Sequence, residues 1–506
     1  MTRHVPPRYD VTQFADLPVG TAGTIDDASV DHVEAEFARL RGRGEYLAAH
    51  DGGRIDPWRY TWHNLNNNGS ENHFQGMQRL ASGKFLAISG GDWRTSTSHV
   101  FIVRMGSRRK RGPWASNTTA KDKRPPDGDR IVGVVGIDGQ MWHAGGMDVL
   151  GNVLAVPVEY PPPGSLPLRR LANLQLPNHG ARARSRVVFL DLSNPESPKR
   201  LRPTIDRARS KATAVALTRL PNRYYVAAVL SARGLDFYLT NTRSFSSGFR
   251  ARPTTWLPHH VRALEGEQRD FGGYQTINFV SQSDGRLYLI GFRNTSPMAP
   301  TIGGDNNADL FAIDLPDSAR APANATDSVP MPTITRVASR QLQCKHRQCN
   351  MAAAAGAYVD QGQARGQGRG QLMVYAAYHW RHSGLIRFNE FRGLTQASKR
   401  QVSQIRDGWI ELFEKKFFDG RFLTLRGSDA FEIADFGEMR VQGSGFDNKV
   451  RSVRFQLPIG AKYRLFRRTD FKAKIIDLIG TGGVSEIADL REHVENAHIS
   501  SARFHP

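Results

Sequence analysis

Six acidic residues stand at or near the starts of predicted strands, where side chains from different strands can meet. They are Asp92, Asp148, Asp270 and Asp305, with Glu159 and Glu265 behind them. Two carboxylates about 5 to 9.5 Å apart across one pocket would suit glycoside hydrolysis. None of the six lies in a recognised motif, and Asp and Glu are common in surface turns, so we interpret them as solvated loop residues.

Two histidines occupy matching places in consecutive segments. His73 precedes Gly76-Met77, and His143 precedes Gly146-Met147. Paired histidines at the mouth of a channel could bind a metal or an anion, but the repeat recurs without histidine elsewhere, which favours a structural hydrogen bond to the adjacent unit of the repeat. The sequence contains neither a glycine-rich phosphate loop nor a nucleophile elbow, so nucleophilic catalysis has no support.

The chain has two cysteines, Cys344 and Cys349, with four residues between them. A local disulfide and two free thiols both fit this spacing. A zinc site with His346 would need further ligands that the neighbourhood does not offer, and the spacing matches no zinc signature.

A theme of short strands recurs between about residues 70 and 392. Each unit opens with a strand rich in Gly or Ala, which suits the crowded centre of a ring of sheets; these strands are 73–78, 143–148, 212–217, 272–277 and 351–356. A more apolar strand and a third strand follow in each unit, with the β-branched and aromatic content typical of strands. The five units predict a five-bladed β-propeller. The alternative is a six-bladed ring completed by residues 58–63.

Segments between these strands are rich in Pro or charge. We assign 106–129, 161–185 and 318–336 to connecting loops. Before the first unit, apolar residues at positions 30, 33, 37 and 40 predict a short amphipathic helix that packs on the ring.

The last hundred residues contain one pattern twice. Phe413, Phe418 and Gly420 recur as Phe466, Phe471 and Ala473, and each copy ends in a polar hexamer, 447–452 and 496–501. This pattern resembles the βγ-crystallin domain, in which the aromatic motif folds as a hairpin and the polar motif contributes calcium ligands. The resemblance implies a double Greek-key sandwich in which the two aromatics of each motif pack together. Ala473 departs from the glycine of the motif, so the second hairpin is expected to be strained or differently shaped.

The resemblance also implies one calcium site. Its ligands would be backbone carbonyls near Glu414 and Lys449 and the Ser500 hydroxyl, a set of hard oxygen donors that suits calcium at weak affinity. The second site of the family would use the position of Arg451, whose guanidinium repels a cation. Calcium is therefore the one cofactor that the sequence suggests.

The net charge is +21, and nearly all of the excess lies before residue 408. The basic runs, including Lys199 to Lys211, sit among Pro, Gly, Ser and Asn and read as solvated loops. They suit an acidic polysaccharide or another anionic partner. No nucleic-acid-binding module is recognisable, which argues against nucleic acid. The sequence contains no run of about 18 apolar residues, so we predict no transmembrane segment.

We therefore predict an all-β chain in four parts: an N-terminal extension with a short helix (1–50), a propeller (51–395), a linker (396–407) and a βγ-crystallin-like domain (408–506). The predicted function is non-enzymatic binding or structural, with a basic ligand surface on the propeller. The alternative is a carbohydrate-active propeller hydrolase with an accessory domain. The location stays open: cytoplasmic by default, because no secretory signal is recognisable, or secreted if a leader was removed.

Overall fold

The computed structural model describes residues 14–15, 28–49, 63–64, 69–70, 72–80, 83–92, 97–106, 129–138, 141–160, 184–231, 233–257, 271–294, 306–315, 331–344, 349–360, 370–378, 386–393, 408–419, 421–426, 432–433, 435–437, 439–441, 444–494 and 498–505. Its regular structure is almost entirely β, which confirms the all-β prediction. One α-helix occurs in these ranges, α1 (Val33–Ala38), and 3-10 turns lie at Phe245–Ser247, Lys416–Phe418 and Leu490–Glu492. No helix in the described part of the chain has the length and apolar character of a membrane span.

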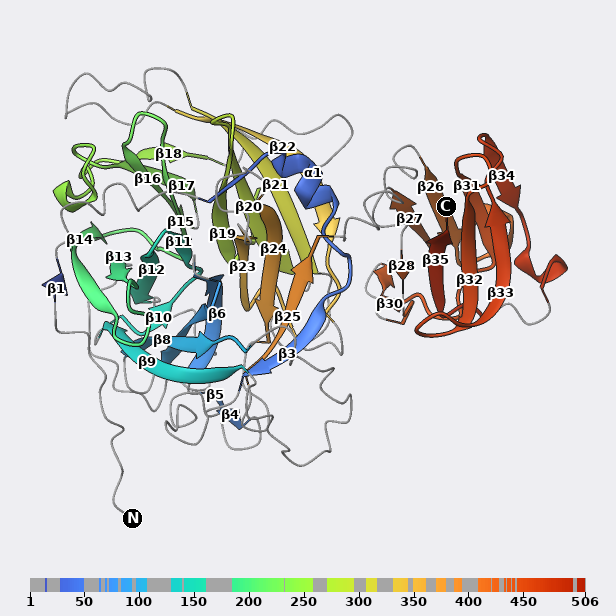
Figure 1. Ribbon diagram of the computed structural model, residues 1–506, viewed down its shortest axis with the longest axis horizontal. Coiled ribbons are helices and arrows are strands. Elements are labelled where there is room, and N and C mark those ends of the chain that lie inside the picture. The colour runs from blue at the N-terminus through green and yellow to red at the C-terminus, as the bar shows by residue number, and fades with distance from the viewer. Residues whose placement is uncertain are drawn as a thin grey trace, which may run out of the picture.

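Five mostly antiparallel sheets follow one another along the chain and lie around a common centre (Figure 1). The first contains β6 (Asn72–Arg79), β7 (Phe85–Asp92), β8 (Thr97–Arg104) and β9 (Arg130–Asp138). The second is ordered β1 (Phe14–Ala15), β14 (Lys199–Arg207), β13 (Arg184–Asp191), β12 (Val153–Tyr160) and β10 (His143–Ala144), with β11 (Asp148–Leu150) also paired to β12. The third contains β15 (Ala214–Arg219), β16 (Tyr225–Ser231), β17 (Gly234–Leu239) and β18 (Thr254–Trp256).

The remaining two sheets of this group each include a strand from the N-terminal segment. The fourth is ordered β2 (Ser29–Val30), β19 (Thr276–Gln282), β20 (Leu287–Asn294), β21 (Asn306–Asp314) and β22 (Thr333–Gln341). The fifth is ordered β23 (Ala354–Asp360), β24 (Gln371–Ala377), β25 (Ile386–Arg392) and β3 (Glu45–Ala49). A separate hairpin joins β4 (His63–Asn64) to β5 (Gly69–Ser70).

Strand β14 of the second sheet corrects one prediction. The run from Lys199 was predicted to be a solvated loop, but residues Lys199–Arg207 form β14. Leu201 and Ile205 of this strand are buried among its charged neighbours. Two buried apolar side chains hold this strand against the sheet. The many arginines around them prevent the strand from being recognised by its sequence pattern.

Glycine and alanine line the inner strands because the sheets meet there backbone to backbone. A Cβ on Gly356 of β23 would lie 1.7 Å from the Met77 carbonyl oxygen of β6, and one on Gly145 would lie 2.0 Å from the Thr213 carbonyl oxygen. Real Cβ atoms cannot approach a backbone oxygen so closely, so only glycine fits these contacts. The second strands, such as β16 and β24, are buried along nearly their whole length because neighbouring sheets cover both of their faces.

The N-terminal segment belongs to the ring of sheets. β3 pairs antiparallel with β25 and completes the fifth sheet, while β1 and β2 add parallel strands to the second and fourth sheets. Helix α1 packs its buried Val33 and Phe37 into the core shared by the fourth and fifth sheets. The predicted boundary at residue 50 therefore separates strands that the structure joins.

Residues from 409 onward form two further four-stranded sheets around a core of their own. One is ordered β27 (Phe422–Arg426), β26 (Trp409–Phe413), β31 (Ser452–Gln456) and β34 (Val484–Ile487). The other is ordered β28 (Glu432–Ile433), β35 (Ser501–His505), β32 (Lys462–Arg468) and β33 (Lys472–Ile479), and a short pair joins β29 (Arg440–Val441) to β30 (Ser444–Gly445). Each four-stranded sheet thus includes a strand from the other half of the region, here β34 and β28.

Candidate anion-binding groove

Asp148 is a predicted acid that the structure places where three sheets of the ring meet. Its carboxylate is buried and accepts hydrogen bonds from four N–H groups: Oδ2 from the amides of Leu217 (2.9 Å) and Phe279 (3.1 Å), and Oδ1 from the Val149 amide (2.9 Å) and Asn278 Nδ2 (3.0 Å). These donors belong to the second, third and fourth sheets. The carboxylate was predicted to be a solvated loop acid, and it is instead a buried link between three sheets.

Glu159 is also buried, and it links the second sheet to the segment before the third. Its Oε2 accepts a hydrogen bond from the Ala212 amide at 3.0 Å, and its Oε1 lies 3.2 Å from His143 Nδ1. Burial raises the pKa of Glu159, but the hydrogen bond from His143, the charge of Lys211 and the Ala212 amide outweigh it and leave the pKa below its usual value. His143 therefore makes a structural contact with Glu159, but this contact lies within the second sheet and does not reach an adjacent one as predicted.

The other predicted residues of this group cannot be placed in the same way. Asp270, Asp305 and Glu265 lie outside the described residues. For Asp92 and His73 the structure describes the backbone, in β7 and β6, where they pair with Asn72 and Gly91 respectively.

Amide side chains fill the centre beside Asp148. Asn278 donates from Nδ2 to Gln78 Oε1 at 3.1 Å and accepts at Oδ1 from the Ala357 amide at 2.8 Å, while Gln78 donates to the Ala357 carbonyl. A cavity of about 50 Å³ remains beside them, lined in part by Gln78 and Asp148. Sequence reasoning missed Gln78 and Asn278, although both lie on strands that it had assigned to the centre or close to it.

A larger groove of about 820 Å³ lies between two hairpin turns of neighbouring sheets. One turn joins β15 to β16, and the other joins β19 to β20. The turns come close at Gly285 and Pro221, where a Cβ added to the glycine would lie 3.7 Å from Pro221 Cγ. The hydroxyls of Thr218 and Ser281 lie 3.3 Å apart across the two sheets. Because the groove is built from tight turns on paired strands, its walls are firmly held.

The groove carries an excess of positive charge. Arg219, Arg223 and Arg286 line it, and among the described residues that line it Asp284 is the one acid. Hydrogen bonds from the Arg286 side chain and amide hold the pKa of Asp284 below its usual range, so this carboxylate stays charged and offsets one guanidinium. Arg223 is exposed, and hydroxyls of Ser29, Ser281 and Ser283 add neutral hydrogen-bonding groups.

Acidic neighbours pair with several basic residues of the second sheet. Arg186 contacts Asp206, and Arg207 makes a buried ion pair with Asp236. Arg104, at the end of the first sheet, pairs with Glu196. The sequence could have identified the groove only through the arginines in the turns at 220–224 and 283–286, which are too few to form a basic run.

In the C-terminal region each aromatic motif forms a folded hairpin. The rings of Phe413 and Phe418 lie 5.6 Å apart, and those of Phe466 and Phe471 lie 5.8 Å apart, both edge to face. Ala473 has a φ of 55°, a conformation that glycine would adopt more easily. Gly420, its counterpart, is outside the described residues.

A serine fastens each hairpin in the same way. Ser452 Oγ accepts from the Phe418 amide and donates to the Lys415 carbonyl, and Ser501 Oγ accepts from the Phe471 amide and donates to the Arg468 carbonyl. The two halves of the region therefore share a local framework and differ in the residues placed on it.

The predicted calcium ligands lie in a strongly basic setting. Ser500 Oγ lies 3.4 Å from Asn448 Oδ1, next to Lys449, while the Glu414 carboxylate forms a two-point ion pair with Arg421. The Arg451 guanidinium donates to the Asn448 carbonyl at 3.2 Å. In the described ranges no cluster of three or more His, Cys, Asp or Glu is placed to hold a metal ion. Calcium binding through carbonyl and hydroxyl oxygens stays a prediction.

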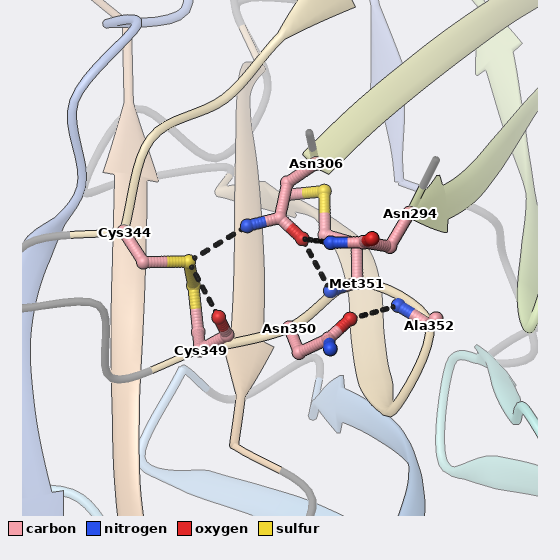
Figure 2. The surroundings of a disulfide bond; sticks show 7 residues. All are labelled: Asn294, Asn306, Cys344, Cys349, Asn350, Met351 and Ala352. Atoms are coloured by element: carbon pink, nitrogen blue, oxygen red, sulfur yellow. Dashed lines mark hydrogen bonds between the residues drawn. A yellow bond between two sulfur atoms is a disulfide. The ribbon is translucent and has the colours of Figure 1, made fainter. Parts of the chain in front are cut away.

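Cys344 and Cys349 form a disulfide between β22 and β23 (Figure 2). Asn306 supports it: Nδ2 donates to Cys344 Sγ at 3.1 Å, and Oδ1 accepts from the Met351 amide at 2.8 Å and from Asn294 Nδ2 at 3.0 Å. Of the two states that the spacing left open, the structure has the disulfide. His346 of the zinc alternative lies outside the described residues.

No protein-family model and no curated protein matches this sequence. Solved structures show a distant likeness. A proposed exo-beta-1,3-galactanase from Bifidobacterium bifidum s17 matches with a TM-score of 0.30 and 10% identity over 70% of this chain and 94% of its own. A proposed hydrolase from Bacteroides ovatus matches with a TM-score of 0.29 and 12% identity over 73% and 90%. The exo-beta-1,3-galactanase 1,3Gal43A from Clostridium thermocellum matches with a TM-score of 0.24 and 9% identity over 88% and 100%. Likeness at this level supports no conclusion about the activity of this chain.

Proposed function

We propose that the chain is a non-enzymatic binding protein for an acidic glycan, built from a five-bladed β-propeller and a βγ-crystallin-like domain. The five consecutive sheets around one centre, closed by β3, support the propeller, and the two serine-fastened hairpins support the second domain. The observation that carries the function is the groove between the third and fourth sheets, in which three arginines face one acid.

The chemistry of the groove suits a polyhydroxylated anion. Guanidinium groups bind carboxylate or sulfate through paired N–H donors, while serine and threonine hydroxyls match sugar hydroxyls. A volume of about 820 Å³ accommodates a short oligosaccharide segment. The rest of the positively charged ring would raise the local concentration of a polyanion by long-range attraction.

The described residues give less support to the alternative function, a carbohydrate hydrolase. Two carboxylates would have to face one pocket, and the Asp148 carboxylate accepts four structural hydrogen bonds, which leaves no lone pair for proton transfer. Glu159 is likewise bound to Ala212 and His143. The observation that favours binding is therefore the groove, which contains arginines and one paired acid.

The test is calorimetric titration of the full chain with oligogalacturonides that carry free carboxylates. Arg223→Glu places a negative charge in the groove, so we expect binding to weaken about tenfold, and added salt should weaken binding of the parent protein. Arg233→Glu, in the turn at the opposite end of the same sheet, is the matched control and should bind as the parent does. Equal loss in both variants would assign the effect to overall charge and reject the groove.

We also propose that the βγ-crystallin-like domain binds one calcium ion weakly through Glu414, Lys449 and Ser500, the first two by their carbonyls. The proximity of Ser500 to Asn448 supports this arrangement. Calorimetric titration with calcium should give a binding signal that Ser500→Ala removes. A signal that survives in Ser500→Ala would reject this ligand set, and no heat in the parent protein would reject calcium binding.

A further inference from the structure

Two phenylalanines of the first C-terminal hairpin are exposed to solvent. Phe417 is 72% exposed and Phe422 is 51% exposed, whereas Phe413, which pairs with Phe422 across β26 and β27, is buried. Phe422 stacks on Phe413 with ring centroids 5.4 Å apart, and Phe413 in turn contacts Phe418. The hairpin thus presents aromatic surface on a rigid base.

Folding does not explain phenylalanine at position 417. The residue has a φ of 58°, in the left-handed region that is costly for bulky side chains. Asp470 holds the same place in the second hairpin, four residues after the first aromatic, with a φ of 57°. Aspartate tolerates this conformation better than phenylalanine does, and the two hairpins otherwise share the serine that fastens them. The first hairpin therefore bears a backbone cost and an exposed ring that its twin avoids.

Each lysine that flanks Phe417 in the sequence forms an ion pair. Lys415 pairs with Asp419 at 3.2 Å, and Lys416 pairs with Asp489. The Phe417 amide donates to the Ala488 carbonyl at 2.8 Å, which fixes the backbone under the ring. A ligand on this surface would meet one aromatic face surrounded by hydrogen-bond donors and acceptors.

We propose that Phe417 is a stacking platform for a sugar ring, with the two lysine–aspartate pairs as hydrogen-bonding partners for its hydroxyls. The negative face of an aromatic ring attracts the polarised C–H groups of a sugar. Two exposed rings are too small for a stable protein interface, which buries about 1,200 Å² or more. An anionic membrane would require unpaired positive charge, and here each lysine faces an acid. This inference extends the proposed glycan binding to a second surface that needs no charge on the ligand.

The test is titration of the full chain with neutral oligosaccharides: methyl-esterified oligogalacturonides and a panel of oligomers of glucose, galactose and xylose. Phe417→Asp copies the residue of the second hairpin. It should weaken binding by about tenfold, the size expected for one stacked ring, and leave the thermal midpoint unchanged or higher. Phe417→Asn should do the same without the added charge. Ile459→Asp, which replaces a side chain that is 84% exposed in the same domain, should bind as the parent does.

The proposal would be overturned if no member of the panel binds the parent protein or if Phe417→Asp binds as tightly as the parent. It would also be overturned if Phe417→Asp and Phe417→Asn both lower the thermal midpoint, which would make Phe417 a packing residue. Binding of the parent to anionic vesicles that depends on Phe417, without saccharide binding, would also overturn it and identify a lipid surface. The groove is tested separately, because Arg223→Glu should weaken binding of the free acid and leave the methyl ester unaffected.

Discussion

At the residue scale, buried carboxylates connect the sheets of the ring. Asp148 receives donors from three sheets, and Asp309 of β21 is fully buried, where it accepts from the Tyr274 hydroxyl at 2.7 Å and lies 3.0 Å from Arg293 Nε. A buried charge is tolerated only when such partners are in place, so removal of one donor would cost more than a surface hydrogen bond. Asp148 thus connects three sheets, whereas Asp309 connects parts of the fourth sheet.

His99 of β8 predicts how stability depends on pH. Burial lowers the pKa of His99 to about 4, whereas an unfolded chain would have the ordinary value near 6.5. Below about pH 6.5 the unfolded state binds a proton that the folded state does not, so stability falls as the pH falls and levels off below about 4. The free energy of unfolding should fall by up to about 3 kcal/mol in total.

Urea unfolding of the parent protein and His99→Phe, measured between pH 7.5 and 4, checks this expectation. The free energy of unfolding of His99→Phe should change less over this range. Carboxylates whose folded pKa is lowered, such as Glu159, lose their contribution at lower pH, below about 4.5, so the two effects are separable. Parallel pH profiles for both proteins would contradict the assignment to His99.

At the element scale, the connections decide how firmly the strands are held. The segment between β22 and β23 is closed by the Cys344–Cys349 disulfide. Asn306, at the start of β21, donates to Cys344 Sγ and accepts from the Met351 amide, and so connects this segment to β21 (Figure 2). Disulfides of this kind persist in oxidising compartments and limit the freedom of the unfolded chain.

Loss of this bridge should lower the free energy of unfolding by about 2 kcal/mol, the value expected for a short closed loop. Urea unfolding of the Cys344→Ser, Cys349→Ser double variant, compared with the parent protein under oxidising conditions, measures the change. A reductant should shift the midpoint of the parent toward that of the variant and leave the variant unaffected. Equal midpoints without reductant would show that the bridge does not constrain the unfolded chain.

At the scale of the whole molecule, the ring is closed by residues from its two ends. β3 pairs with β25, and a buried cluster joins Arg79 of the first sheet to Tyr375 and Glu390 of the fifth. Burial and the charge of Glu390 raise the pKa of Tyr375, so the phenol stays protonated and donates to the carboxylate. Backbone pairing therefore adds the N-terminal strand β3 to the fifth sheet, and a buried charge network joins the fifth sheet to the first.

The central strands of the sheets could be predicted from sequence because their side chains report their surroundings directly. Runs such as Tyr225–Ser231 and Leu287–Asn294 are apolar because sheets cover both of their faces, and the glycines near the centre are required by backbone contact. Strands β14 and β3 could not be predicted in the same way, because one covered face leaves only a few apolar residues among charged ones.

The sequence by itself determined the all-β class, the order of the main strands, the two aromatic hairpins and the basic character of the first four hundred residues. Only the tertiary structure decided that Asp148 is a buried link, that β3 closes the ring, and that Arg219, Arg223 and Arg286 share one groove. The physical reason is range: strand formation depends on neighbours two residues apart, whereas burial, charge pairing and grooves depend on residues brought together from distant parts of the chain.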